Sequence, residues 1–248
     1  MLTRERAHTW IERWDRQQEG YLPYREERFT ALIDAVAAHR PDPLVIDLGC
    51  GPGSLSARLL ARLPEATVVA VDTDPLLLAL GEAEYGHLPG LRFVRQDLRE
   101  PGWTAALGLD RPADAAVSTT ALHWISEPSL RAVYAELAGV LHPGGMYLNG
   151  DHLAASAPRL RRLEESLADQ ATARRYGDAP PEDWSQWWGA VAADPDLGPL
   201  VLDRSATHHG SESLLLDSHV TALRAAGFTE IGPLWQRGND RVLCALLP

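Results

Sequence analysis

A glycine-rich segment that follows a short apolar run constrains the fold of this chain most strongly. Leu44–Gly53 reads Leu-Val-Ile-Asp-Leu-Gly-Cys-Gly-Pro-Gly, and a segment with helical spacing comes directly after it. A strand, a glycine loop and a helix in this order build a ligand site at the carboxyl end of a strand in α/β sheets. Glycine lets a ligand approach the backbone closely, and the start of the helix offers unpaired N–H groups to an anion. The sequence therefore predicts a binding site at this loop.

The loop differs from the dinucleotide-binding fingerprint, which requires a glycine where this chain has Ser54. Instead, Val45–Gly53 resembles the first motif of the class I S-adenosylmethionine-dependent methyltransferases. The resemblance extends over nearly the whole chain and is weakest over residues 154–207. It implies S-adenosyl-L-methionine as the cofactor and S-adenosyl-L-homocysteine as the product.

Acidic or hydroxyl residues end each of the predicted parallel strands. Asp72 ends the apolar run Val68–Asp72, Asp97 follows Leu91–Val94, and Ser118 ends Ala113–Ser118. Parallel strands open at one edge of a sheet, so these side chains are expected to converge there. The resemblance implies that Asp72 binds the ribose and that Asp97 and Leu98 contact the adenine, whereas a turn role is the alternative for both acids. The predicted cofactor-binding residues are Asp47, Gly49, Cys50, Gly51, Gly53, Asp72, Thr73, Asp97, Leu98 and Ser118.

The predicted fold is an α/β, doubly wound, mostly parallel seven-stranded sheet of the Rossmann-like methyltransferase type with a helical cap. Residues 1–40 are expected to form an N-terminal helical lid of two helices, broken at Gly20 and Pro23. Residues 41–153 and 208–248 form the expected core, and residues 154–207 the expected helical substrate cap. Strands are predicted over residues 44–48, 68–72, 91–94, 113–118, 146–150, 228–235 and 241–246. Residues 141–145 are predicted to form a turn, and residues 217–226 a helix ended by Gly227.

His123 is the candidate catalytic base, because it follows the fourth predicted strand and histidine titrates near neutral pH. The alternative is that it shapes the pocket or donates a hydrogen bond. His152 has the same position after the fifth strand and carries less weight. The candidate substrate-binding residues are Trp14, Tyr21, His152, Trp184, Trp188 and His208. For the tryptophans of residues 154–207, packing within the cap is the competing interpretation.

The segment Ala121-Leu122-His123-Trp124 is also similar to the trans-aconitate methyltransferase group, whose members methylate small carboxylic acids. Such an acceptor favours an arginine fork. The available residues are Arg25, Arg174, Arg175 and Arg204. The alternative for each of them is a solvated position on the surface. His208, His209 and His219 form a C-terminal histidine cluster without metal-binding spacing, so no metal is predicted.

Composition limits the partners and the compartment. The formal net charge of −11 disfavours general nucleic-acid binding, and no apolar run is long enough to span a bilayer. Two cysteines suggest no disulfide framework, which favours a reducing cytoplasm. All 23 basic residues are arginine, which excludes Schiff-base chemistry at a lysine. The expected partner is a small molecule, with no nucleic acid or membrane, and the expected state is a monomer or homodimer.

The sequence thus predicts methyl transfer to an oxygen, carbon or nitrogen atom of a small acceptor, by in-line displacement. Candidate acceptors are a natural-product intermediate and a small carboxylic acid. One alternative is a protein that binds the cofactor and catalyses a non-methylating reaction or transfers nothing. The other is a nicotinamide oxidoreductase on a similar sheet, which the Asp47 and glycine pattern disfavours.

Overall fold

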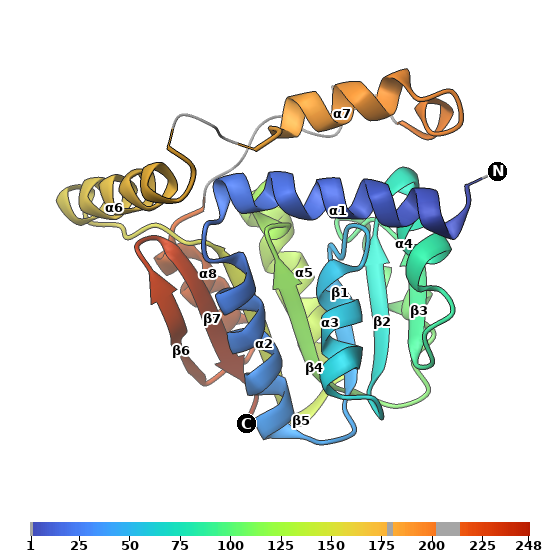
Figure 1. Ribbon diagram of the computed structural model, residues 1–248. Helices are drawn as coiled ribbons and strands as arrows, with labels where there is room; N and C mark the ends of the chain where they lie inside the picture. Colours follow the sequence, from blue (N-terminus) through green and yellow to red (C-terminus); the bar gives the residue numbers. More distant parts are fainter. Residues whose placement is uncertain (1, 178–180, 202–213) are drawn as a thin grey trace.

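A computed structural model describes residues 2–177, 181–201 and 214–248 of the 248-residue chain. Its centre is a seven-stranded sheet of order β3-β2-β1-β4-β5-β7-β6 (Figure 1). Strands β1 to β5 are parallel, and β7 runs antiparallel to both β5 and β6. The strands are β1 (Leu44–Leu48), β2 (Thr67–Asp72), β3 (Leu91–Arg95), β4 (Ala113–Thr119), β5 (Leu141–His152), β6 (Glu230–Arg237) and β7 (Asp240–Leu246). This confirms the doubly wound, mostly parallel sheet that the sequence predicts.

Helices cover both faces of the sheet, because the central strands are apolar on both sides. All five residues of β1 are buried. Helices α2 and α3 pack on one face through Phe29, Leu32 and Leu55, and α5 and α8 pack on the other. The helices are α1 (Arg4–Tyr21), α2 (Arg25–His39), α3 (Ser54–Arg62), α4 (Pro75–Tyr85), α5 (Glu127–Val140), α6 (Pro158–Tyr176), α7 (Trp184–Ala193) and α8 (Leu216–Ala225), with short 3-10 segments η1 (Trp103–Leu107), η2 (Leu122–Trp124) and η3 (Gly198–Leu200).

The N-terminal segment forms two helices with different positions. Helix α1 begins at the cap Thr3, whose hydroxyl accepts a hydrogen bond from the Arg6 N–H at 3.3 Å, and it ends before Pro23. Figure 1 shows α1 lying across the carboxyl ends of the parallel strands, whereas α2 runs down the sheet face. The placement of α1 puts a helix over the edge where ligands bind in this kind of sheet.

Helix α7 lies above α1 in Figure 1 and packs on it through tryptophans. A capping box starts α7, since Asp183 accepts from the Gln186 N–H while the Gln186 side chain accepts from the Asp183 N–H. Trp187 is fully buried, and its ring N–H donates to the Trp10 carbonyl at 3.3 Å. Helix α6 has an exposed apolar stripe instead, with Leu160, Leu163 and Leu167 at least half exposed.

The fifth strand is longer than predicted, and the expected turn at residues 141–145 falls within its bounds. The prediction of a turn before the strand is therefore wrong in its boundary. The pairing with β4 moves from Ala113–Leu141 to Ala115–Met146, so Pro143 and the two following glycines bulge out of the ladder. Gly144 takes a positive φ of 79°, and its N–H donates to the Pro248 carbonyl at 3.1 Å.

Other boundaries differ from the predicted ones by a few residues, as in β6, which begins at Glu230 rather than at Phe228. Helix α8 covers Leu216–Ala225, and Gly227 follows with the positive φ of 104° that favours glycine after a helix. In the described part of the chain, no helix combines the length and apolar character that a membrane crossing requires.

Candidate functional site

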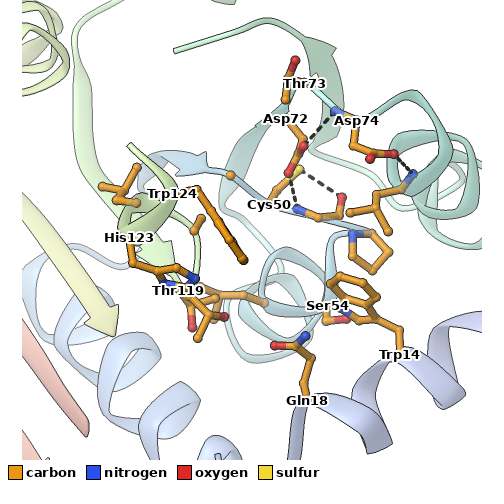
Figure 2. A pocket seen from close by; sticks show the side chains of 18 of the residues that line it. Trp14, Gln18, Cys50, Ser54, Asp72, Thr73, Asp74, Thr119, His123 and Trp124 are labelled. Atoms are coloured by element: carbon orange, nitrogen blue, oxygen red, sulfur yellow. Dashed lines mark hydrogen bonds between the residues drawn. The ribbon is translucent and has the colours of Figure 1, made fainter. Parts of the chain in front are cut away.

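A cavity of about 590 Å³ opens at the carboxyl edge of the sheet, between α1, the glycine loop, the segment after β4 and the start of α7. Figure 2 shows Trp14 and Gln18 of α1 on one side of this cavity and Trp124 on the other. The volume lies within the range of about 300–1,000 Å³ that is usual for small-molecule sites. The residues that line the cavity come from elements that are distant in the sequence, so the fold assembles it.

The glycine loop forms the floor of the cavity beside β2. The N–H groups of Gly49 and Cys50 both donate to the Val71 carbonyl, at 2.8 and 3.0 Å. Gly49 has a φ of 70°, and a Cβ on it would lie 2.3 Å from the Cβ of Ala121. Only glycine permits this conformation together with this close approach, which brings the segment after β4 against the loop.

Asp72 at the end of β2 holds the loop and also lines the cavity. One carboxylate oxygen accepts from the Gly51 N–H at 2.8 Å, and the other accepts from the Asp74 N–H at 2.9 Å (Figure 2). Burial raises the pKa of Asp72 above its usual range, and these N–H donors oppose that rise. Each carboxylate oxygen can accept a further hydrogen bond, so a ligand hydroxyl could bind here.

His123 lies in η2, and a buried carboxylate orients its ring. His123 Nδ1 lies 2.9 and 3.0 Å from the two carboxylate oxygens of Asp151, the second-last residue of β5. Burial lowers the pKa of His123, but the charge and hydrogen bond of Asp151 outweigh burial and raise the pKa above its usual value. Burial likewise raises the pKa of Asp151, yet His123 and Arg28 outweigh it and hold this pKa well below its usual range. Among the described residues, none forms a hydrogen bond with His123 Nε2, the nitrogen opposite Asp151.

Arg28 of α2 lies beneath this pair and is fully buried. Its guanidinium donates to Asp240 at 3.0 Å and to the Thr119 hydroxyl at 2.9 Å. Arg28, Asp240, Asp151 and His123 thus form a group of four ionisable side chains, which we call the buried charge group. Its charges balance when His123 is protonated, since two cations then face two carboxylates.

The backbone between β4 and η2 is strained at Thr120. This residue has a φ of 49°, a conformation that is unfavourable for a β-branched side chain. The Thr120 N–H donates to the Gly150 carbonyl at 3.0 Å. Such strain persists where the surrounding structure fixes the backbone, and it concentrates at functional sites. Here it turns the chain so that Ala121, His123 and Trp124 all line the cavity.

The side chain of Asp15 holds α1 over the cavity through hydrogen bonds and ion pairs. Its carboxylate accepts from Arg25 at 2.9 Å, from the Ser54 hydroxyl at 2.7 Å and from Arg58 at 3.1 Å. Burial raises the pKa of Asp15, but the two arginines outweigh burial and lower it. These contacts join α1 to α2 and to the first turn of α3, next to the glycine loop.

Aromatic side chains form the outer side of the cavity. Trp14, Tyr21, Trp124 and Trp184 line it, and the Tyr21 hydroxyl accepts from the Trp184 backbone N–H at 3.1 Å. Trp188 is buried behind Trp184, with ring centroids 5.9 Å apart. Trp188 therefore contacts the lining rather than forming part of it.

Most of the predicted site residues line this cavity. They are Trp14, Tyr21, Gly49, Cys50, Gly51, Asp72, Thr73, Asp97, Leu98, His123, His152 and Trp184. Asp47, Gly53, Ser118 and Trp188 are not part of the lining. Asp47 accepts from the Ser56 hydroxyl at 2.6 Å, and burial raises its pKa to about 7. Ser118 donates to the Leu48 carbonyl at 2.8 Å. His208, His209 and Arg204 lie outside the described residues.

Several lining residues were not predicted from the sequence. Gln18, Ser54 and Trp124 line the cavity without having been named as site residues, whereas Thr119 and Asp151 lie at strand ends that were expected to open on this edge. The helical spacing of Trp14, Gln18 and Tyr21 would have indicated that Gln18 shares their face. The pairing of Asp151 with His123 joins residues 28 positions apart on different elements, and no local pattern indicates it.

The C-terminal His219 has a structural position. It is buried against α5, with Nδ1 2.7 Å from the Tyr134 hydroxyl, and burial lowers its pKa to about 4. Within residues 2–177, 181–201 and 214–248, no three histidine, cysteine or acidic side chains come together in a way that could hold a metal ion.

Comparison with known proteins identifies the family. A model of the methyltransferase domain matches residues 45–145. The chain is 32% identical over 202 residues to a trans-aconitate 2-methyltransferase of Methylobacterium radiotolerans, which covers 76% of this chain and 71% of the relative. It is 35% identical over 197 residues to the trans-aconitate 2-methyltransferase of Methylobacterium nodulans, covering 74% and 70% of the two chains. The protein belongs to the class I S-adenosylmethionine-dependent methyltransferases, and S-adenosylmethionine is its methyl donor.

Solved structures share the fold at lower identity. The magnesium protoporphyrin IX methyltransferase of Synechocystis PCC 6803, solved with bound S-adenosylhomocysteine, matches with a TM-score of 0.57 at 17% identity, covering 97% of this chain and 95% of that one. The N-methyltransferase NodS of Bradyrhizobium japonicum matches with a TM-score of 0.55 at 16% identity, covering 91% and 97%. Family membership decides for a methyltransferase and against the nicotinamide oxidoreductase.

Proposed function

We propose that this methyltransferase acts on a small carboxylic acid and converts one of its carboxylates into a methyl ester. The observation that carries the proposal is the His123–Asp151 pair at the cavity, with Nδ1 engaged by the carboxylate at 2.9 Å and Nε2 on the opposite side of the ring. The names of the relatives, trans-aconitate 2-methyltransferases, support an acidic acceptor.

The charge balance around His123 favours a protonated ring. Asp151 raises the pKa of His123, and the buried charge group is neutral overall when the ring is an imidazolium. An imidazolium cannot act as a base, but its Nε2–H donates a charge-assisted hydrogen bond to an anion. We therefore assign His123 the role of binding and orienting the acceptor carboxylate, which is already deprotonated and needs no base.

The residues at the glycine loop fit the cofactor. Gly51 has a φ of 55°, a conformation that favours glycine, and a Cβ there would be in ordinary contact with Trp14 at 3.8 Å. We propose that the N–H groups at the start of α3 hold the carboxylate of the cofactor, that Asp72 holds its ribose, and that Asp97 and Leu98 contact its adenine. As a carboxylate, Asp97 accepts hydrogen bonds and donates none. In this structure its carboxylate lies 2.7 Å from the guanidinium of Arg99.

Bound S-adenosylmethionine would supply an electrophilic methyl group to the acceptor carboxylate, and S-adenosylhomocysteine would be the product that leaves. The chain has to align the acceptor with that methyl group and to exclude water. Alignment of this kind can contribute about 7–11 kcal/mol to lowering a barrier. His123 fixes one end of the acceptor, and α1 with Trp14 and Gln18 covers the cavity.

We also propose that the protein works in the cytoplasm as a monomer or homodimer, without nucleic-acid or membrane partners. Cys50 and Cys244 are both buried free thiols, which is consistent with a reducing compartment. The net charge of −11 opposes binding to nucleic acid in general.

The test is to incubate the protein with S-adenosylmethionine labelled in its methyl group and with a panel of small carboxylic acids that includes trans-aconitate. A methyl ester releases its label as methanol in alkali, whereas a methyl ether or a methylamine does not. We expect the labelled product to be labile in alkali. We also expect His123→Gln to reduce the formation of this product at least about tenfold. Label that stays bound in alkali would overturn the proposal and would favour a hydroxyl or nitrogen acceptor.

A further inference from the structure

The cavity has one apolar side that the cofactor-binding loop does not form. Trp124 of η2, Trp184 at the start of α7 and Tyr21 at the end of α1 make up this side, which we call the aromatic wall. The ring centroids of Trp124 and Trp184 lie 6.5 Å apart at an interplanar angle of 32°. Trp124 also lies beside His123, with 5.0 Å between ring centroids. The wall therefore begins next to the group that orients the acceptor.

Packing behind the wall holds it in place. Trp188 contacts both Trp184 and Trp14, and Trp187 contacts Trp188, Trp14 and Trp10 with ring centroids 4.8 to 5.8 Å apart. Most of these pairs are edge-to-face, the arrangement that aromatic rings prefer. Trp184 is thus backed by the buried ring of Trp188, which packs in turn on Trp187 and Trp14.

The two arginines of the described lining are each paired with an acid of the same chain. Arg25 is paired with Asp15 at 2.9 Å, and Arg99 with Asp97 at 2.7 Å. The cofactor side adds the carboxylates of Asp72 and Asp74. These charges suit a cofactor that carries an amine and a sulfonium, but they repel an acceptor with several carboxylates.

We propose that the acceptor is a monocarboxylic acid with a flat aromatic body, whose carboxylate binds at His123 while its ring packs on the aromatic wall. This rests on the proposed carboxyl methylation. It separates the protein from an enzyme for an aliphatic tricarboxylate, although its relatives carry the name of one. Trp124 and Trp184 are then the residues that determine specificity.

The experiment compares three acids of graded character: cinnamate, which is flat and aromatic, crotonate, which is its aliphatic counterpart, and trans-aconitate. Release of S-adenosylhomocysteine gives kcat/KM for each acid, and titration in the presence of S-adenosylhomocysteine gives its Kd. We expect cinnamate to be preferred to both other acids by at least about tenfold, because ring stacking adds to apolar burial.

Variants link this preference to the wall. Trp184→Leu and Trp124→Leu should each lower the ratio of kcat/KM for cinnamate over crotonate by about tenfold, whereas Trp184→Phe should retain most of it. Trp235→Leu is the matched control, because Trp235 lies in β6 and does not line the cavity. A ratio does not depend on the folded fraction of a variant, so a loss of stability cannot imitate the effect.

The outcomes separate this proposal from the one on which it rests. A preference for trans-aconitate, or equal effects of Trp184→Leu on all three acids, overturns the aromatic subsite while carboxyl methylation stands. Binding of cinnamate that depends on Trp184, without formation of an alkali-labile ester, supports the subsite and overturns carboxyl methylation. Failure of cinnamate to bind at all overturns the subsite.

Discussion

Two aspartates at the carboxyl edge of the sheet, the half-buried Asp72 and the buried Asp151, differ in their hydrogen-bond partners. Asp72 accepts from backbone N–H groups of the loop, and Asp151 accepts from an ionisable ring. The first arrangement shapes a backbone that binds a ligand. The second raises the pKa of His123, to which we assign the acceptor carboxylate, so the charge of His123 is the property of the site to test first.

The His123 role predicts a pH dependence with a definite sign. Asp151 raises the pKa of His123 above its usual value of about 6.5. The protonated ring binds the carboxylate, so kcat/KM for an acid should fall as pH rises through this pKa. The charge of Arg28 lowers the pKa of both members of the pair, and burial lowers the pKa of the neighbouring His152. A pH profile of kcat/KM measures the limb, and a rise with pH instead would show that His123 is a base.

Asp151→Asn is the variant that tests the cause of this limb. Without the carboxylate charge, burial and the charge of Arg28 act on His123, and both lower its pKa. The falling limb should therefore move to lower pH, and kcat/KM at neutral pH should drop. An unchanged limb would mean that another group titrates.

Asp72→Asn should weaken S-adenosylmethionine binding by about 10- to 100-fold, since a charge-assisted hydrogen bond contributes roughly 1.5–3 kcal/mol. The asparagine can still accept one hydrogen bond but also brings an N–H₂ group toward the Gly51 and Asp74 donors. Calorimetric titration measures the Kd. Asp34→Asn on the exposed side of α2 is the control and should bind as the parent protein does. Equal affinities would remove Asp72 from the cofactor site.

Sequence patterns predicted the lining residues of the glycine loop and of the strand ends better than the contacts around His123. Gly49, Gly51, Asp72 and Asp97 lie at strand ends or in a loop whose local pattern is informative. Asp151 acts through a contact of η2 with β5, and Arg28 through contacts of α2 with β4 and β7, which no local spacing encodes. Asp47 shows the opposite case, because its motif predicted a binding role while its carboxylate is buried against Ser56.

At the scale of elements, apolar runs identified β1, β2 and β4, because buried parallel strands are apolar on both faces. The bulge in β5 escaped prediction, since Pro143 and its glycines are typical of a turn wherever they occur. The exposure of the apolar residues of α6 and α7 depends on the elements that pack against these helices. Periodicity predicted both as helices but could not distinguish the exposed leucines of α6 from the buried Trp187 of α7.

The attachment of α1 gives a prediction about stability. Asp15→Ala leaves Arg25 buried without its carboxylate, and removing one partner of a buried ion pair costs about 3–5 kcal/mol. Denaturant unfolding should show this loss in the free energy of unfolding. Asp42→Ala is the control, because its ion pair with Arg40 is exposed and contributes at most about 1 kcal/mol.

Because of these contacts, the free energy of unfolding should depend on pH in the acidic range. The pKa of Asp15 is lowered in the folded chain, so its contribution is present above the ordinary value of about 3.9 and is lost as pH falls through the folded value. The difference in unfolding free energy between the parent and Asp15→Ala should therefore shrink on acidification below that value. A constant difference would mean that the carboxylate charge does not stabilise α1.

Three parts of the chain that are far apart in the sequence enclose the cavity. Trp14 comes from the N-terminal helix, Asp72 and His123 from the sheet edge, and Trp184 from residues inserted after β5. A ligand in this cavity contacts all three parts at once. Binding should therefore stabilise α1 and α7 together with the core, rather than the sheet alone.

This coupling predicts a measurable shift. At a concentration about 100 times its Kd, S-adenosylmethionine should stabilise the protein by about 2.7 kcal/mol, which corresponds to a rise in Tm of roughly 5–11 °C for a chain of this size. Limited proteolysis under the same conditions should show slower cleavage in both α1 and α7, with NAD as the control ligand that protects neither. Protection of the core with unchanged cleavage of the two helices would mean that they do not close the site, and the aromatic wall would then have to act without its support from α1.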